Sequence, residues 1–314
     1  MDDAIETVEL EQVACPCCHS TGATYWSEER GYVVVRCDAC RFLYVNPRPR
    51  MTSIERSVRS GEHLVAGRRI NARARRIPRK VNIYKKSLTS LFADRVKSRE
   101  PLEWVDVGAG YGEIMEAVGQ IAPARSRVMG VEPMTHKADV ARGLGLEVIN
   151  GFLEPGRFQA DVISAVNIFS HIPDFHSLLT TISSNLKASG EVFIETGNLA
   201  DLDHRSEAPG ILDLPDHLVF SGEAHMLRYL NDAGFELVTI KRVRVDGFTT
   251  FAKNLVKRMM GRPAVIGAPY SSRYRQLLIR ARRAGTAGGT SEKRMPPNSG
   301  NADRQQSSRR GAAS

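Results

Sequence analysis

Hydrophobic and polar positions alternate in a regular way through the middle of the chain. From Leu102 onward, short apolar runs are separated by segments with helical spacing, such as GEIMEAVGQIA and SLLTTISSNLKASG. The runs that read as buried strands are LEWVDVG, RVMGVEP, LEVIN, ADVISAVN and GEVFIET. Strands that alternate with helices in this way are typical of a mostly parallel sheet flanked by helices. We therefore predict an α/β fold.

The pattern changes at the end of this region. FELVTIKRVRV and FTTFAKN flank the turn residues Asp246-Gly247, which predicts two strands joined at a tight turn, the last of them antiparallel. We expect the sheet to occupy residues 100–255 and a C-terminal helical segment to occupy residues 256–284. Residues 285–314 hold almost no apolar side chains and are predicted to be disordered.

Residues 51–99 read as a basic helical connecting segment. Residues 41–99 carry 17 Lys/Arg against 3 Asp/Glu, and residues 253–314 carry 14 against 2, so the net charge of +9 belongs to these two regions. Because few aromatic residues are interleaved with the basic ones, solvated helix faces are favoured over a nucleic-acid surface. One apolar stripe is expected in this segment: Ile83, Leu88, Leu91, Phe92 and Val96.

Two further features concern location. No stretch approaches the ~20 consecutive apolar residues of a membrane span. The start MDDAIETVELE lacks the basic and apolar regions of a signal peptide. We expect a cytoplasmic protein with no membrane partner.

All the cysteines lie near the start of the chain. Cys15-x2-Cys18 and Cys37-x2-Cys40 are two pairs separated by 18 residues, the spacing of a tetrahedral four-thiolate zinc site. Cys17 is the spare thiol, and its exchange with Cys18 is the alternative ligand set. A module of residues 1–50 is too small to fold on apolar burial alone, so Zn²⁺ is expected to be structural. Four thiolates also leave no open position for water or substrate.

A glycine-rich turn follows the first strand, with Gly108, Gly110 and Gly112 at alternate positions. Glycine lets the backbone approach a ligand closely, but the spacing is neither the dinucleotide pattern nor a phosphate loop. Asp106 lies within the strand, where a carboxylate would face a cation or an amine. Glu132 ends the next strand, where an acid can bind both hydroxyls of a ribose. A ligand with a ribose, an ammonium group and no phosphate fits these features, and S-adenosylmethionine is such a ligand.

Each acid also has a simpler interpretation. Asp106 could only accept hydrogen bonds from loop amides, and Glu132 could only cap the helix that follows Pro133.

At these motifs the chain resembles the class I S-adenosylmethionine-dependent methyltransferases. Within them it is similar to the group with an N-terminal zinc-binding domain, which includes deoxysugar C-methyltransferases. The resemblance rests on VDVGAGYG, VMGVEP, ADVISAVNIFSHIPD, LKASGEVFIETGN, LPDHLVFSGEAHMLRYLNDAGFELV and CDACRFLYVNPRP, and it covers roughly residues 12–253. It implies a Rossmann-like methyltransferase sheet with a small zinc-ribbon-like module.

The resemblance also implies roles for single residues. Asp106, Gly108, Gly110 and Glu132 would bind the cofactor, with Gly151-Phe152 near the adenine and Asn167 over the methionine end. His217, beside Asp216, resembles the histidine that serves as catalytic base in the deoxysugar enzymes, although Leu214 stands where those enzymes carry a tyrosine. Other histidines in the same region are His171, His204 and His225.

Three classes of function follow. The favoured one is transfer of a methyl group to an oxygen or carbon of a small molecule. The second is an RNA methyltransferase that would hold phosphates with the zinc module and the Arg-rich segment. Against it, VNIF after the fourth strand is not the motif expected for methylation of an exocyclic base nitrogen. The third class is a cofactor-binding protein without turnover. The pattern leaves the acceptor and the oligomeric state open.

Overall fold

The computed structural model describes residues 8–65, 68–71, 75–208, 210–262, 264 and 266–284. The tail predicted to be disordered, residues 285–314, lies outside the described residues, as do the first seven residues of the predicted zinc module.

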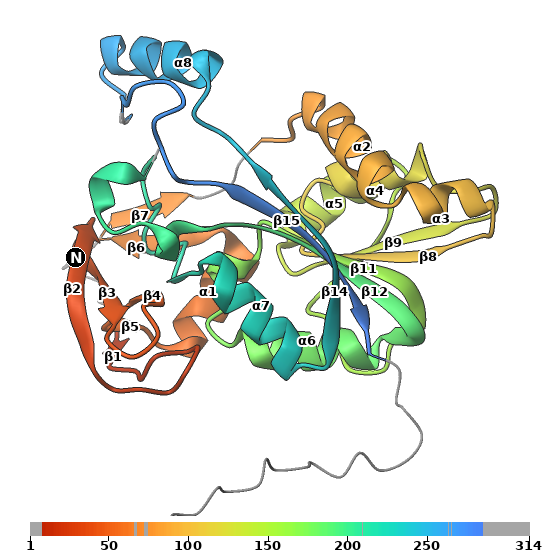
Figure 1. Ribbon diagram of the computed structural model, residues 1–314, viewed down its shortest axis with the longest axis horizontal. Coiled ribbons are helices and arrows are strands. Elements are labelled where there is room, and N and C mark those ends of the chain that lie inside the picture. The colour runs from red at the N-terminus through yellow and green to blue at the C-terminus, as the bar shows by residue number, and fades with distance from the viewer. Residues whose placement is uncertain are drawn as a thin grey trace, which may run out of the picture.

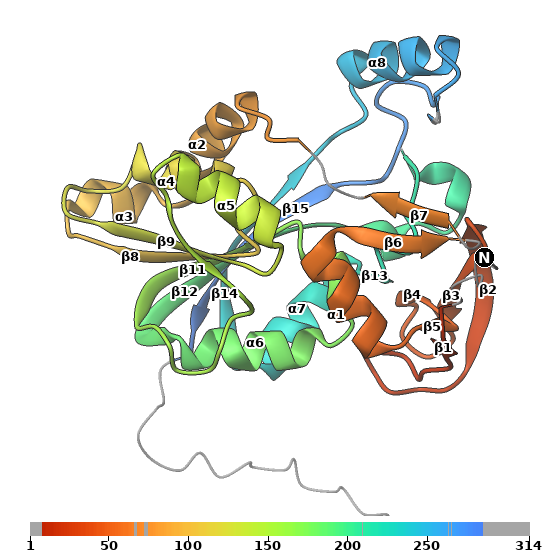
Figure 2. The same ribbon diagram turned by 180° about the vertical axis from the view of Figure 1, so that it is seen from behind.

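A seven-stranded sheet forms the centre of the described chain, in the order β10-β9-β8-β11-β12-β15-β14 (Figures 1 and 2). Five strands run parallel: β8 (Glu103–Val107), β9 (Arg127–Glu132), β10 (Glu147–Asn150), β11 (Ala160–Val166) and β12 (Leu186–Gly197). β15 (Gln276–Arg283) lies antiparallel between β12 and β14 (Phe235–Val243). The predicted α/β class, with a mostly parallel sheet and an antiparallel last strand, is confirmed.

The identity of that last strand was predicted wrongly. FTTFAKN is not a strand but the start of helix α8 (Phe248–Met259), and the antiparallel strand lies within residues 256–284, where we expected helix. The reason is Arg280, a charged residue at a position that is only 4% exposed. Its guanidinium pairs with Glu191 at 2.8 Å and Asp94 at 2.7 Å, so a strand whose middle is buried has the sequence of a polar segment.

Helices cover both faces of the sheet. On one face lie α2 (Arg79–Leu91), α3 (Ala93–Ser98), α4 (Glu113–Gly119) and α5 (Thr135–Gly143); α6 (Phe175–Ser184) and α7 (Glu223–Asp232) lie on the other (Figures 1 and 2). Leu88, Leu91 and Phe92 are buried around Trp104, as the apolar stripe predicts. Ile83 is 58% exposed, so the prediction that it belongs to the apolar stripe was wrong.

The cysteine-bearing region is built into the same core. Its sheet has the order β13-β4-β3-β2, formed by β2 (Ala23–Glu29), β3 (Tyr32–Cys37), β4 (Leu43–Val45) and β13 (Val219–Phe220). β13 comes from the chain after β12, so the last strand of this sheet is supplied from a distance in sequence. Arg36 donates to the carbonyls of Ala200 and Leu202, and the carboxylate of Glu29 accepts from three amides at residues 212–214.

The basic segment contains more than helices. After the short pair β1 (Leu10–Glu11) and β5 (Arg48–Pro49) comes α1 (Met51–Ser60), then the hairpin of β6 (Glu62–Val65) and β7 (Arg68–Asn71). Three short helical turns, η1 (Phe169–His171), η2 (Leu199–Asp201) and η3 (Arg205–Glu207), lie in the loops after β11 and β12. Among the described helices, none combines the length and apolar character needed to span a bilayer.

Candidate functional site

The glycines of the loop after β8 lie in different surroundings. Gly108 has a φ of +70°, and a Cβ there would come within 2.5 Å of the Cγ2 of Ile168. Gly110 has a φ of +58°, and a Cβ there would meet nothing closer than 4.0 Å. Both positions require a left-handed backbone that L side chains rarely adopt. The loop therefore leaves open space beside Gly110 at the carboxyl edge of β8, where open α/β sheets bind ligands.

Asp106 is a buried carboxylate near this space. Its side chain is 2% exposed and accepts a 2.5 Å hydrogen bond from the Ser164 hydroxyl, which in turn accepts from the Trp104 indole at 2.9 Å. Burial raises the pKa of Asp106 to about 7. No cationic side chain of the described residues pairs with it. A positively charged ligand would therefore stabilise the ionised form.

Glu132 fixes the shape of the loop. Its Oε2 accepts from the amide of Gly110 at 2.7 Å and its Oε1 accepts from the amide of Met134 at 2.9 Å. These bonds match the capping interpretation. They do not use all the lone pairs of a carboxylate, which can accept about four hydrogen bonds, so binding of ribose hydroxyls by the same group remains a prediction.

The loop after β11 closes the site from the other side. Asn167 has a φ of +55°, and its side-chain amide donates to Glu195 at 3.2 Å. Gln276, on β15, donates to the same carboxylate. Burial raises the pKa of Glu195. Asn167 is thus brought next to the glycine loop through its neighbour Ile168.

Phe152 lies at the outer edge of this region and is 40% exposed. The guanidinium of Arg59, from α1, lies 4.6 Å from the centre of its ring. A ring held under a cation in this way can also stack against an adenine, but only where Arg59 leaves a face free.

A second cluster joins histidines from three parts of the chain. One oxygen of Asp216 lies 3.1 Å from His63 Nε2 and 3.1 Å from His171 Nδ1. Burial opposes ionisation of Asp216, but the bonds from His171 and His63 outweigh it and hold its pKa below the usual range. Burial likewise works against a charged His171, yet Asp216 raises the pKa of that ring. His171 and Asp216 thus behave as an ion pair.

His217 is held differently. Its Nδ1 lies 2.8 Å from the carbonyl of Leu212, and since a carbonyl only accepts, Nδ1 carries the proton and Nε2 keeps a lone pair. Burial, helped by the neighbouring His171, lowers the pKa of His217. The ring centres of His171 and His217 lie 4.8 Å apart. The two pKa shifts therefore favour a neutral ring at His217 and a protonated ring at His171.

A cavity of about 170 Å³ opens beside His63, His171 and Asp216, whereas His217 is not among the residues that line it. It lies between α1, β6 and the loop that leads to β13, and its wall includes Tyr32, Ser53, His63, His171 and Asp216. The cavity therefore lies between the basic segment and the end of the parallel sheet. Its walls offer hydroxyl, imidazole and carboxylate groups to a polar molecule.

Comparison with known proteins decides the family. A profile described as "Methyltransferase domain" matches residues 74–240, more than half of the chain. The chain belongs to this methyltransferase family. This confirms the resemblance to class I S-adenosylmethionine-dependent methyltransferases, whereas the zinc-binding part of that resemblance stays a prediction.

Two relatives extend the comparison. The C-methyltransferase NovU of Streptomyces niveus is 26% identical over 195 residues, which are 57% of this chain and 44% of that protein. The chain thus spans less than half the length of this curated relative. The structure of a putative sarcosine dimethylglycine methyltransferase from Galdieria sulphuraria has a TM-score of 0.51 at 15% identity, covering 65% of this chain and 86% of that one. The second likeness shows that the methyltransferase fold is shared.

One of the other candidate histidines, His225, has a different task in this methyltransferase fold. His225 accepts from the amide of Gly222 at 3.0 Å and donates to the carbonyl of Cys40 at 2.7 Å, so it ties α7 to the cysteine region. Neither nitrogen is left to take a proton. His204 precedes η3, and its backbone amide donates to Glu207.

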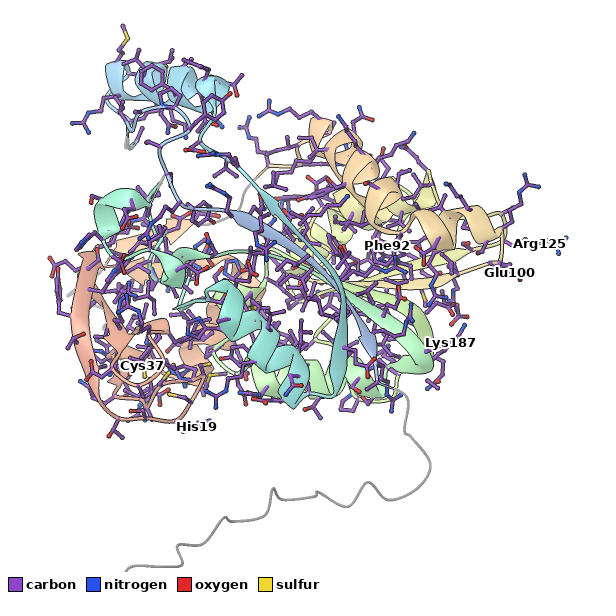
Figure 3. The ribbon with its side chains drawn as sticks, viewed as in Figure 1. His19, Cys37, Phe92, Glu100, Arg125 and Lys187 are labelled. Atoms are coloured by element: carbon purple, nitrogen blue, oxygen red, sulfur yellow. The ribbon has the colours of Figure 1, made fainter. Side chains whose placement is uncertain are left out.

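The predicted zinc ligands come together. The sulfur atoms of Cys15, Cys18, Cys37 and Cys40 lie within 4.8 Å of one another, with Cys15 and Cys40 3.6 Å apart and Cys18 and Cys37 3.5 Å apart. Zn–S bonds of about 2.3 Å in a tetrahedron need sulfur atoms roughly this far apart. Cys17 is buried outside the cluster. His19 is exposed and lies at the rim of this region, while Cys37 lies among the sulfur atoms (Figure 3).

Sequence reasoning missed four groups near the site: His63, Ser164, Glu195 and Arg59. His63 lies on β6 in the basic segment, far in sequence from Asp216, and only the tertiary fold brings the two together. Ser164 and Glu195 lie inside the predicted strands ADVISAVN and GEVFIET, where a polar residue in an apolar run was the available signal.

Proposed function

We propose that this protein is an S-adenosylmethionine-dependent methyltransferase that acts on an oxygen or carbon atom of a small molecule. The observation that carries the proposal is the buried carboxylate of Asp106, which no cationic side chain of the described residues neutralises, together with the open glycine loop. A cationic ligand that fits against bare backbone satisfies both features. When bound, S-adenosylmethionine supplies an electrophilic methyl group on a sulfonium.

The residues divide the remaining work. Asp106 would face the cationic end of the cofactor, Glu132 would bind its ribose, Phe152 would lie near its adenine and Asn167 would lie over its methionine end. The acceptor occupies the cavity beside His171 and Asp216. His217, whose ring centre lies 4.8 Å from that of His171, would accept the proton of the acceptor on Nε2 and become an imidazolium, while the acceptor takes the methyl group and the methyl–sulfur bond breaks to leave S-adenosylhomocysteine.

Carbon methylation is the finer proposal, and the similarity to a C-methyltransferase supports it. The RNA alternative is less well supported, because arginines of the basic region pair with acids of the chain: Arg48 with Glu11, Arg50 with Glu9, and Arg76 with Glu116. The four cysteines would hold a structural Zn²⁺, which supplies no chemistry to the reaction.

Incubation with methyl-labelled S-adenosylmethionine and a fractionated metabolite extract tests this proposal. We expect the label in a small molecule whose mass has grown by one CH₂ group. Label in RNA alone would establish the second class of function, and label in neither fraction, despite cofactor binding, would establish the third.

Changing Glu132 should weaken cofactor binding. We expect Glu132→Ala to lose on the order of 1–3 kcal/mol of affinity for S-adenosylmethionine, because hydroxyl partners of the ribose are left unpaired. Calorimetry measures this directly. Glu147→Gln, an exposed acid on the neighbouring strand β10, is the matched control and should bind as the wild type does. Equal affinity for Glu132→Ala and the wild type would leave Glu132 with only its role in shaping the loop.

Asp106 should make cofactor binding depend on pH. Its folded-state pKa of about 7 lies above the ordinary 3.8, so the ionised form that attracts a cation is present above pH 7 and is lost as the pH falls through that value. Affinity for S-adenosylmethionine should therefore fall below pH 7 in the wild type. It should be lower and nearly independent of pH in Asp106→Asn.

The same substitution should stabilise the ligand-free protein. Ionising a buried carboxyl costs free energy of folding, and this cost grows from about pH 4 to pH 7 because the folded-state pKa is the higher one. At pH 8, Asp106→Asn should raise the free energy of unfolding by on the order of 1 kcal/mol or more. A melting temperature that falls while the affinity is unchanged would contradict both parts of the prediction.

A further inference from the structure

Helix α8 lies apart from the body of the protein. It sits between β14 and β15, at the end of a long excursion of the chain, and projects beyond the sheet in both views (Figures 1 and 2). None of its residues is buried. The cofactor and acceptor residues proposed above lie elsewhere, so α8 has no task in that chemistry.

The helix is amphipathic, but its apolar side faces away from the protein. At 100° per residue, five residues share one side of α8, which we call the outer face: Phe248, Ala252, Leu255, Val256 and Met259. All five are exposed, with Phe248 at 67% and Met259 at 80%. The ring of Phe248 packs edge-on against that of Tyr270, which is itself 53% exposed.

The opposite side of α8 faces the protein. Thr250, Phe251 and Asn254 line a cavity of about 230 Å³ between the helix and residues of η3 and the segment before β15. Two of these three residues are polar. A surface helix normally directs its apolar side inward. The reversed arrangement indicates that the outer face contacts something other than the body of this chain.

Charge identifies the kind of partner. From Phe248 to Arg262 the chain carries four basic residues and no acidic one: Lys253, Lys257, Arg258 and Arg262. Asp246, just before the helix, is buried and pairs with Arg244. Basic residues beside an exposed face of Phe, Leu and Met are typical of helices that lie in the surface of an anionic membrane. A second copy docked through the same face would instead bring two sets of basic residues together.

We propose that the outer face of α8 docks this protein peripherally on an anionic lipid surface. The apolar side chains would enter the boundary between headgroups and acyl chains, while Lys253 and Arg258, which are exposed and flank the outer face, contact phosphate groups. This contact differs from a membrane span and goes beyond the proposed methyl transfer. It would hold the enzyme at a surface without closing the cofactor site.

Vesicle flotation with the full chain tests the proposal. Vesicles of phosphatidylcholine alone and of phosphatidylcholine with phosphatidylglycerol are compared at low and high salt. We expect binding only to the anionic vesicles, weaker at high salt because ions screen the attraction. Absence of binding to the anionic vesicles would overturn the proposal.

Two variants separate the apolar and the charged contribution. Leu255→Glu combined with Met259→Glu places acids on the outer face, and we expect at least a 10-fold loss of vesicle affinity. Lys253→Gln combined with Arg258→Gln removes two positive charges that attract lipid phosphates, each worth about fivefold in vesicle affinity. The vesicle affinity of this variant should therefore fall roughly 25-fold. Ile83→Glu, at an exposed apolar position on α2, is the matched control and should bind like the wild type.

Two controls keep the result specific. All variants should bind S-adenosylmethionine like the wild type, which shows that the fold is intact. Sedimentation without vesicles should give the same mass for the wild type and for Leu255→Glu with Met259→Glu. A wild-type dimer that becomes a monomer in this variant would show that the outer face docks a second copy. Unchanged vesicle binding by both double variants would place the lipid contact elsewhere. Either result overturns the proposal.

Discussion

His217→Ala should slow methyl transfer by roughly 10²–10⁴-fold, the usual size of a general-base contribution, while affinity for S-adenosylmethionine stays nearly the same. The expectation rests on the tautomer. Because Nδ1 donates to the carbonyl of Leu212, Nε2 is the nitrogen that can accept a proton, and the lowered pKa keeps the ring neutral. Single-turnover transfer to the identified acceptor measures the rate.

The pH dependence of the rate gives an independent readout. A base must be deprotonated to work, so the rate should fall as the pH drops through the pKa of His217, which lies below the usual 6.5. The wild type should thus stay active into mildly acidic solution. In His217→Ala this fall in the rate at low pH should disappear.

A purely structural role predicts a different outcome. If His217 only anchors its loop through Leu212, the variant should lose melting temperature with little change in the rate per folded molecule. His204→Ala removes an exposed histidine from the same region and should change neither quantity. A near-normal rate for folded His217→Ala would remove this residue from the mechanism.

His171 is the competing candidate for the base, and the structure distinguishes the two. Its Nδ1 lies against Asp216, and the raised pKa favours the charged ring, which has no lone pair to offer. A charged His171 beside the acceptor would instead attract a developing negative charge. The sequence did not separate the two histidines, because both follow strands of the sheet and the difference lies in what each Nδ1 contacts.

The parallel part of the sheet was predictable because each of its strands carries its own signal. The runs that end in Gly108, Glu132 and Asn167 are apolar over several residues, and the order of strands brings their carboxyl ends to one edge. The candidate cofactor residues follow from that edge. Local pattern and global fold agree there, so a reading of short segments was sufficient.

The antiparallel end of the sheet and the proposed acceptor cavity depend on contacts between distant segments. β15 contains Arg280, whose charge is compensated by Glu191 and Asp94 some ninety and one hundred eighty residues earlier in the chain. Likewise His63, on β6, contacts Asp216, which lies far later in the chain, in the loop before β13. Periodicity within one segment carries no information about such partners, which explains why the strand was taken for a helix and His63 was missed.

The cysteine region should prove inseparable from catalysis although it performs no chemistry. β13 pairs with β4, and it directly follows the loop that carries Asp216 and His217. Arg36 and Glu29 hold two segments that precede that loop, at residues 200–202 and 212–214. Disturbing the cysteine cluster would therefore displace the proposed base and the acceptor cavity, while the glycine loop on the central sheet stays in place.

Cys37→Ser should lose tightly bound zinc, whereas Cys17→Ser should keep one zinc per chain. Cys37 lies 3.5 Å from Cys18 inside the cluster, and Cys17 lies outside it, near Tyr229. Burial raises the pKa of Cys15 to about 12 and also raises that of Cys40, so in the absence of a metal these thiols stay neutral and the attraction that closes the cluster is missing. Elemental analysis of protein purified without chelator gives the zinc content.

The two variants also separate structure from chemistry in this enzyme. We expect Cys37→Ser to lower the melting temperature and to reduce methyl transfer, with cofactor affinity less affected than the rate, because β13 and the His217 loop lose their support. In Cys17→Ser the free energy of unfolding should fall by at most about 1–2 kcal/mol. This is the size of effect expected when a buried thiol is replaced by a hydroxyl that needs a hydrogen-bond partner. Zinc-free wild-type protein with normal stability and normal turnover would refute the structural zinc, and loss of zinc in Cys17→Ser with retention in Cys18→Ser would exchange these two residues in the ligand set.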